Sequence, residues 1–188
     1  MRFKKQNFFS NRSAIALTFA CLFVTTAGHA QSNESVVRDW NEVMLNAIRN
    51  DLARPNVHAR NLFHFTEGVY FLQLNTEGAD AAGIASEVQN WPAADDALLQ
   101  IQNDAAAFDH AVAAFGYRMI QLRYAQSPGW AFTLSNLVTA FINSTSSTPN
   151  VLLSASPAAA WGWACAEAIN GAYQFDGSNQ VNNYENTC

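Results

Sequence analysis

The stretch that decides the fold is residues 36–71, which read VVRDWNEVMLNAIRNDLARPNVHARNLFHFTEGVYF. Its first half places apolar residues every three or four positions, which predicts an amphipathic helix over residues 35–51 with Ser35 as its N-cap. Pro55 fits the first turn of a second helix over residues 55–72, because an N–H in that turn would lack an intrahelical partner anyway. The second helix is apolar on more than one side, so we expect it to be buried.

The rest of the chain repeats this helical pattern. Long apolar periodicity predicts a helix over residues 93–125, in which Gly116 marks a kink or a close packing contact. Serine–proline pairs open two further helices, over residues 127–142 and 156–173, with a polar loop between them. Because no segment shows sustained period-two alternation, the sequence predicts an all-α fold, a bundle of about five or six helices.

Residues 1–30 have the three parts of a secretory signal peptide: a basic start, an apolar run over residues 14–26 and small residues before a cleavage point. We expect cleavage between Ala30 and Gln31, and therefore a secreted or periplasmic protein whose residues 31–188 form one helical domain. The alternative is a membrane anchor, which is disfavoured because a span needs about 20 apolar residues.

The charge balance of the chain is acidic. The whole sequence has 10 basic and 15 acidic residues. Four of the basic residues lie in the expected signal peptide, so residues 31–188 have 6 basic and 15 acidic residues and a net charge of −9. No lysine follows residue 30. Such a surface argues against nucleic acid or anionic lipid as a partner, because both need clustered positive charge.

Two cysteines, Cys165 and Cys188, remain after the expected processing. In an oxidising compartment an even pair could form a disulfide that ties the C-terminal end to a helix. The alternative is two unpaired thiols.

Two blocks of the sequence carry a resemblance to a known family. The first is residues 37–65, including VHARNLFH at 57–64, and the second is residues 114–186, including RYAQSPG at 123–129 and DGSN at 176–179. Their order and spacing resemble the N-terminal helical region of vanadium-dependent haloperoxidase-like proteins, within the type 2 phosphatidic acid phosphatase superfamily. The resemblance implies a helical region of an exported protein, and a family chemistry of peroxide-dependent halide oxidation at vanadate.

The chain departs from this family where the chemistry lies. The family holds vanadate or phosphate with a Lys and an Arg-Pro, a Ser-Gly-His, and an Arg followed by a His, which together cradle an oxyanion. Here the one Arg-Pro is Arg54-Pro55, and the other motifs do not occur. We therefore assign no catalytic, cofactor-binding or metal-binding residue, and expect a truncated relative that is inactive alone and has no cofactor of its own.

Two other functions fit the same sequence. The first is a periplasmic helical module for binding or assembly, and the second is a scaffold half completed by a separately encoded, phosphatase-like catalytic half. In both cases an apolar helix face would remain for self-association or a partner chain.

Several individual residues could form a metal, acid–base or sugar-binding site, but a packing or surface role is favoured for each. His58 and His64 differ by about 240° around a helix, so they cannot chelate one metal, and packing histidines are the favoured interpretation. Asp109 and His110 are adjacent and face different ways, which favours surface charge over an acid–base pair. The tryptophans around Gly162 could form a sugar platform, but core anchors are the favoured interpretation.

Overall fold

The computed structural model describes residues 27–51, 54–78, 83–84, 88–178 and 180. Within these ranges the chain is helical and has no strand, which confirms the predicted all-α class. The helices are α2 (Ala27–Asn50), α3 (Pro55–Thr76), α5 (Asp95–Asn103), α6 (Ala107–Tyr124), α7 (Trp130–Thr145), α8 (Pro149–Ala155) and α9 (Pro157–Tyr173). None of the helices within these ranges is both long enough and apolar enough to cross a membrane.

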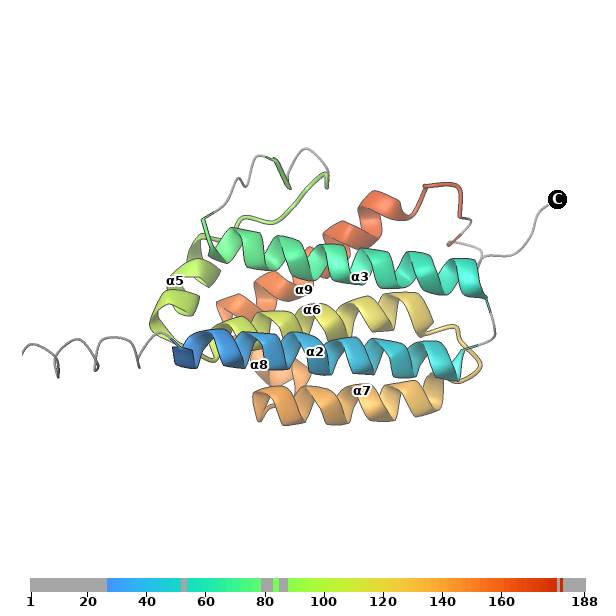
Figure 1. Cartoon of the computed structure of the whole chain (residues 1–188), viewed down its shortest axis with the longest axis horizontal. Helices are drawn as coiled ribbons and strands as arrows, with labels where there is room; N and C mark the ends of the chain where they lie inside the picture. Colours follow the sequence, from blue (N-terminus) through green and yellow to red (C-terminus); the bar gives the residue numbers. More distant parts are fainter. Residues whose placement is uncertain (1–26, 52–53, 79–82, 85–87, 179, 181–188) are drawn as a thin grey trace, which may run out of the picture.

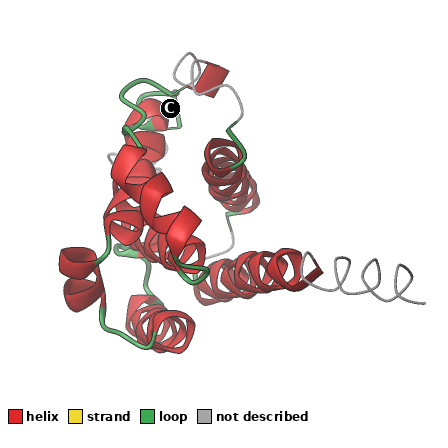
Figure 2. Cartoon of the chain, turned by 90° about the vertical axis from the view of Figure 1, so that its left-hand side faces the viewer, coloured by secondary structure: helices red, strands yellow, loops and turns green. Residues whose placement is uncertain are grey.

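Helix α6 is the centre of the bundle, and 13 of its 18 residues are buried. Its most extensive contact is with α9, and it also packs against α2, α3 and α7. Figure 1 shows α2, α3, α6 and α7 running side by side, and Figure 2 shows several of these helices from their ends. A helix packed against so many neighbours needs a largely apolar sequence, and residues 111–117 of α6 are alanine, valine, glycine and aromatic residues.

Glycines allow the helices to approach α6 closely. A Cβ atom on Gly116 would lie 2.4 Å from Cε3 of Trp40, so the predicted close packing contact is confirmed. A Cβ atom on Gly162 would lie 2.1 Å from the carbonyl oxygen of Ala111, which brings the backbones of α9 and α6 into contact. An ion pair of 2.7 Å between Arg118 and Glu167 spans the same two helices.

The single helix predicted over residues 93–125 is wrong, because the structure divides it into α5 and α6. Asp104 between them has extended backbone (φ −135°, ψ 112°), and its carboxylate accepts the N–H of Ala106 at 3.0 Å. Short polar side chains compete with helical hydrogen bonds in this way. The apolar period continues across the break, which is why the pattern alone missed it.

Helix starts were predicted with mixed success. The prediction of Ser35 as an N-cap is wrong, since α2 begins at Ala27 and runs through Ser35. Ser156 is the N-cap of α9 and accepts the N–H of Ala159, and Pro55 occupies the first turn of α3. After Ser127 the chain turns once more, so α7 begins at Trp130 rather than at residue 127.

Candidate functional site

Polar and charged side chains gather where α3, the end of α6 and the end of α9 meet. We name this group the arginine–histidine cluster. Its members are Arg60, His64, Glu67, Arg123, Tyr173, Asp176 and Gln180. It is the part of the described chain where a buried histidine and a buried arginine touch, so it is the candidate site.

Helix geometry brings three members of the cluster to one face of α3. Arg60, His64 and Glu67 follow each other at steps of four and three residues, which places them along a single stripe. Arg123 lies one residue before the end of α6 and is 7% exposed. Its guanidinium therefore meets the α3 stripe inside the bundle rather than at its surface.

Tyr173 is the last residue of α9, and the turn after it supplies the remaining members of the cluster. The carboxylate of Asp176 accepts the N–H of Ser178 at 3.1 Å, and Gly177 adopts a φ of +86°, which favours glycine. An aspartate that accepts a backbone N–H two residues further on, followed by glycine with positive φ, is typical of a turn. The chain then returns to the bundle, where the amide of Gln180 donates to Oδ1 of Asn170 at 2.8 Å.

The two guanidinium groups converge on this returning segment. Arg60 donates to Oδ2 of Asp176 at 2.7 Å and to the carbonyl oxygen of Tyr173 at 2.6 Å. It also donates to Oε1 of Gln180 at 3.1 Å, and Arg123 donates to the same oxygen. One carboxamide oxygen is thus held by two cations from two different helices.

His64 is held between a ring and a cation. Its imidazole stacks on the ring of Tyr173 with centroids 3.9 Å apart and 10° between the planes, and its Nδ1 lies 3.3 Å from Nη2 of Arg123. A guanidinium only donates, so Nδ1 accepts and the proton of the neutral ring is on Nε2. The Tyr173 hydroxyl in turn donates to Oε1 of Glu67 at 3.0 Å.

The electrostatics of the cluster follow from this packing. Burial, together with the neighbouring charges of Arg123 and Arg60, lowers the pKa of His64 to about 3 against the opposing effect of Asp176. Burial alone would raise the pKa of Asp176, but the hydrogen bonds from Arg60 and Ser178 outweigh it and lower the pKa to about 2. At neutral pH the cluster holds a neutral histidine, two guanidiniums and an ionised Asp176.

The structure shows the surroundings of the histidines and of the Asp109–His110 pair considered in the sequence analysis. His58 and His64 lie apart, as predicted: His58 stacks near Tyr124 with ring centroids 6.4 Å apart, while His64 belongs to the cluster. Within the described ranges, no group of three His, Cys, Asp or Glu side chains is placed to hold a metal ion. Asp109 and His110 are half-buried rather than plain surface charge, and burial raises the pKa of Asp109.

The tryptophans are packing residues, as favoured. Trp161 is buried and donates to the carbonyl oxygen of Pro92 at 3.3 Å, and Trp163 stacks on Tyr117. Cys165 is fully buried in α9, and burial raises the pKa of its thiol. Cys188 lies outside the described residues, so the Cys165–Cys188 disulfide stays a prediction, as does the signal peptide over residues 1–30.

The cluster itself was not predicted from the sequence. Arg60 and Asp176 are 116 positions apart, and Arg123 and His64 are 59 apart, so no local pattern joins them. The one indication in the sequence was that these four residues lie in the two blocks that resemble the haloperoxidase-like family, residues 37–65 and 114–186. No family model matches the chain, and no curated protein or solved structure is significantly similar to it.

Proposed function

We propose that this chain is an exported helical scaffold module of haloperoxidase-like ancestry, in which the arginine–histidine cluster fixes the C-terminal segment to the bundle. The observation that carries the proposal is the convergence of Arg60 and Arg123 on the oxygen of Gln180. The carboxamide of Gln180 therefore lies between the two guanidinium groups. Charge-assisted hydrogen bonds of this kind are about twice as strong as neutral ones, so they are suited to holding a segment in place.

The same cluster joins the two blocks on which the proposed ancestry rests. Arg60 and His64 come from the first block of resemblance, and Arg123 and Asp176 come from the second. Residues that drew attention in separate parts of the sequence are in contact in the folded chain. Any compact helical bundle brings such segments together, so the proposed ancestry rests on the resemblance of the two blocks alone.

The geometry also favours a second candidate, which is an oxyanion-binding site. Two guanidiniums directed at one oxygen would suit an oxygen of phosphate or vanadate as well as a carboxamide. In that case Gln180 would yield to the ligand. The two candidates differ in the group that the guanidiniums bind: the side chain of Gln180 in a scaffold, and an oxygen of phosphate or vanadate in an oxyanion site.

The test is thermal unfolding of the full chain with and without millimolar vanadate or phosphate, together with hydrogen exchange of residues 174–178. For a scaffold we expect neither anion to raise the Tm. We also expect Gln180→Ala to speed exchange in this segment about tenfold or more, because a hydrogen bond to a charged group contributes about 1.5–3 kcal/mol.

Two variants make the result decisive. Arg38→Gln is the matched control, since that arginine is exposed on α2, and it should change neither readout. Gln180→Glu places a carboxylate between the guanidiniums and should slow the exchange of residues 174–178. If vanadate or phosphate instead raised the wild-type Tm and Gln180→Glu abolished the effect, the cluster would be an oxyanion site and the scaffold proposal would be wrong.

A further inference from the structure

The sequence contains one Asn-Gly pair, Asn170-Gly171, and the structure places it in the last turn of α9. In an Asn-Gly pair the asparagine side chain reacts readily with the next backbone nitrogen, because glycine has no Cβ atom to hinder the approach. Gly171 is exposed, and a Cβ atom at its position would have nothing within 4 Å. Water therefore reaches this pair, and no neighbouring helix crowds it.

The reaction open to this pair is deamidation, and its only co-reactant is water. The backbone nitrogen of Gly171 attacks Cγ of Asn170, and the bond from Cγ to Nδ2 breaks. The amide group leaves as ammonia with the proton that Gly171 gives up, and a succinimide ring closes. Water then opens the ring at either carbonyl group, which gives aspartate or, in larger amount, isoaspartate. In isoaspartate the backbone runs through the former side chain and is longer by its methylene group.

Hydrogen bonds in the folded chain oppose this reaction. The helical backbone directs the N–H of Gly171 to the carbonyl oxygen four residues earlier, away from the asparagine side chain. The side chain of Asn170 is itself held, because Nε2 of Gln180 donates to its Oδ1 at 2.8 Å. Arg60 donates to Gln180 and, at 2.6 Å, to the carbonyl oxygen of Tyr173 at the end of α9. The bonds that hold the C-terminal segment therefore also keep the last turn of α9 closed.

We propose that Asn170-Gly171 is a site of spontaneous deamidation, which the attached C-terminal segment slows and whose isoaspartate product releases that segment. The longer backbone at position 170 distorts the last turn of α9, so the carbonyl oxygen of Tyr173 loses its place beside Arg60. The stacking of Tyr173 on His64 depends on the same turn. The inference rests on the proposed function, because it requires Gln180 to fix this segment to the bundle.

The one Asp-Gly pair of the sequence, Asp176-Gly177, lies in the same segment and is protected differently. Ring closure there has to expel a hydroxyl group from a protonated carboxyl group. Arg60 and the backbone N–H of Ser178 donate to the two carboxylate oxygens and keep the group ionised. Since an ionised carboxylate resists attack by a backbone nitrogen, the modification belongs to Asn170 and not to Asp176.

Peptide mass spectrometry of the full chain, incubated in mildly alkaline buffer, measures the reaction, because an acid in place of the amide raises the peptide mass. We expect slow deamidation of the folded wild type and rapid deamidation of the chain unfolded in urea. Gln180→Ala should speed the reaction of the folded chain about tenfold or more, the factor expected for lost hydrogen bonds to charged groups. Gly171→Ala should suppress it in folded and unfolded chains alike.

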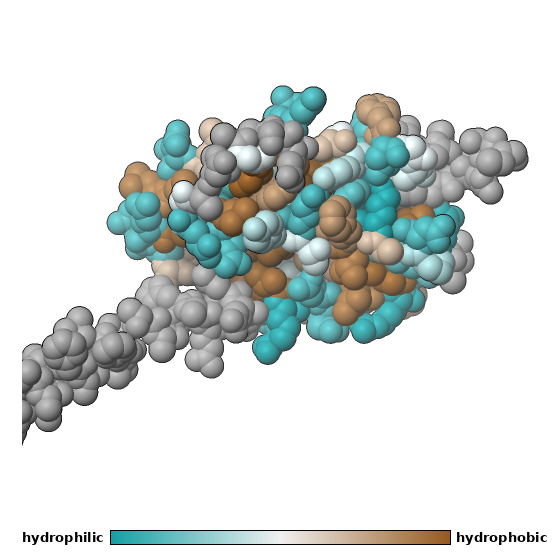
Figure 3. Space-filling model, turned by 45° about the horizontal axis from the view of Figure 1, so that its top comes forward, coloured by the Kyte–Doolittle hydropathy of each residue, from teal (hydrophilic) through white to brown (hydrophobic). Residues whose placement is uncertain are grey.

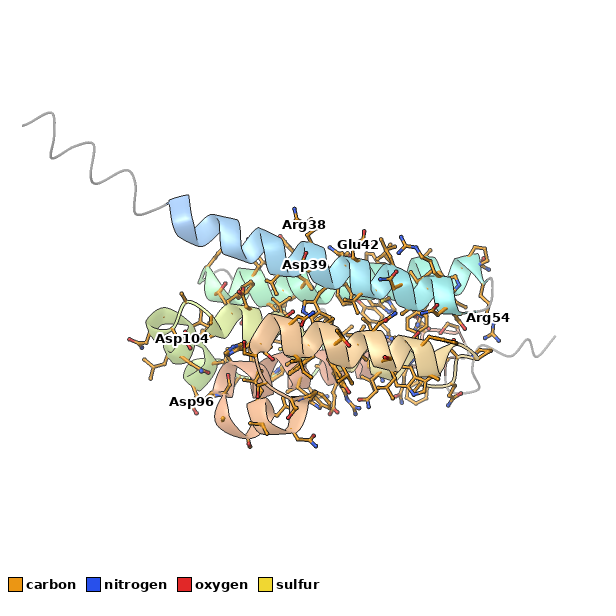
Figure 4. All side chains as sticks on the ribbon, turned by 90° about the horizontal axis from the view of Figure 1, so that it is seen from below. Arg38, Asp39, Glu42, Arg54, Asp96 and Asp104 are labelled. Carbon is orange, nitrogen blue, oxygen red and sulfur yellow. The ribbon has the colours of Figure 1, made fainter. Side chains whose placement is uncertain are left out.

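Arg38→Gln is the matched control, since the side chain of Arg38 points away from the bundle on α2 (Figure 4) and is exposed. It should leave the rate unchanged. A folded wild type that deamidates as fast as the unfolded chain would overturn the proposal, and so would a Gln180→Ala chain that deamidates at the wild-type rate. Hydrogen exchange of residues 174–178 in the same samples separates the two proposals. If Gln180→Ala speeds exchange but not deamidation, the scaffold stands and this inference is wrong; if it speeds neither, both are wrong.

Release of the segment is tested on the modified chain. Deamidation adds a negative charge, so anion exchange separates the product from the wild type. We expect residues 174–178 to exchange about tenfold or more faster in the isoaspartate form, because the hydrogen bonds to Arg60 are lost. Asn170→Asp is the matched control: it has the new charge and an acceptor for Gln180 without the longer backbone, and should exchange like the wild type. An isoaspartate form that exchanges like Asn170→Asp would contradict the release.

Discussion

His64 remains neutral in the folded protein because it is buried beside two guanidiniums, and this couples stability to pH. The folded pKa is lowered from 6.5 to about 3, so below pH 6.5 the unfolded chain takes up a proton that the folded chain does not. The contribution of His64 to stability is therefore complete above pH 6.5 and is lost progressively as the pH falls towards 3. Asp176 acts in a lower window, between its ordinary pKa and about 2.

His64→Gln separates this effect from general acid sensitivity. Glutamine keeps an acceptor for Arg123 but does not titrate, so the variant should lose less stability than the wild type between pH 6.5 and 4.5. The expected difference is up to about 1.4 kcal/mol per pH unit. Urea unfolding at the two pH values measures it. Equal losses in the two proteins would show that His64 is protonated in the folded state.

At the scale of single helices, the contact between α9 and α6 depends on one glycine. A Cβ atom at Gly162 would meet the backbone of Ala111 and could not be relieved by rotating a side chain. Gly171 on the same helix has nothing within 4 Å of its Cβ position. Replacing glycine with alanine at these two positions therefore tests the same change with and without a neighbouring backbone.

We expect Gly162→Ala to lower the Tm by roughly 2–12 °C, since overpacking costs about 1–3 kcal/mol and 1 kcal/mol shifts the Tm of a chain this size by about 2–4 °C. Gly171→Ala should leave the Tm unchanged or raise it slightly, because alanine is the better helix former by about 0.5–1 kcal/mol. Differential scanning calorimetry measures both. Equal tolerance of alanine at the two sites would mean that the α6–α9 backbones do not touch.

The helical elements also show how far the sequence could be interpreted. Period and proline position predicted α3 and α9 well, because the signals for their starts are local: Pro55 in a first turn, and Ser156 as a cap. The division between α5 and α6 was missed because the apolar period continues past Asp104. The cluster was missed for a different reason: its members meet only after three helices have packed.

At the scale of the whole molecule, hydrophobic and hydrophilic residues are interspersed on the face shown in Figure 3, whereas the buried residues concentrate around α6. The pair α6–α9 has the most extensive contact in the bundle, while α5 contributes one buried residue, Ala97. Local stability follows burial, because a segment with few buried contacts can open while the rest stays folded.

Native-state hydrogen exchange should therefore distinguish helices that exchange only by global unfolding from helices that open locally. We expect amides in the middle of α6 and α9 to exchange only through global unfolding, with a free energy equal to that from urea unfolding, and amides of α5 to exchange through a smaller local opening. Gly162→Ala should lower the protection of α6 and α9 together and leave the local opening of α5 unchanged. If α5 were protected as strongly as α6, the bundle would unfold as one unit, and α6–α9 would not be its separate stable core.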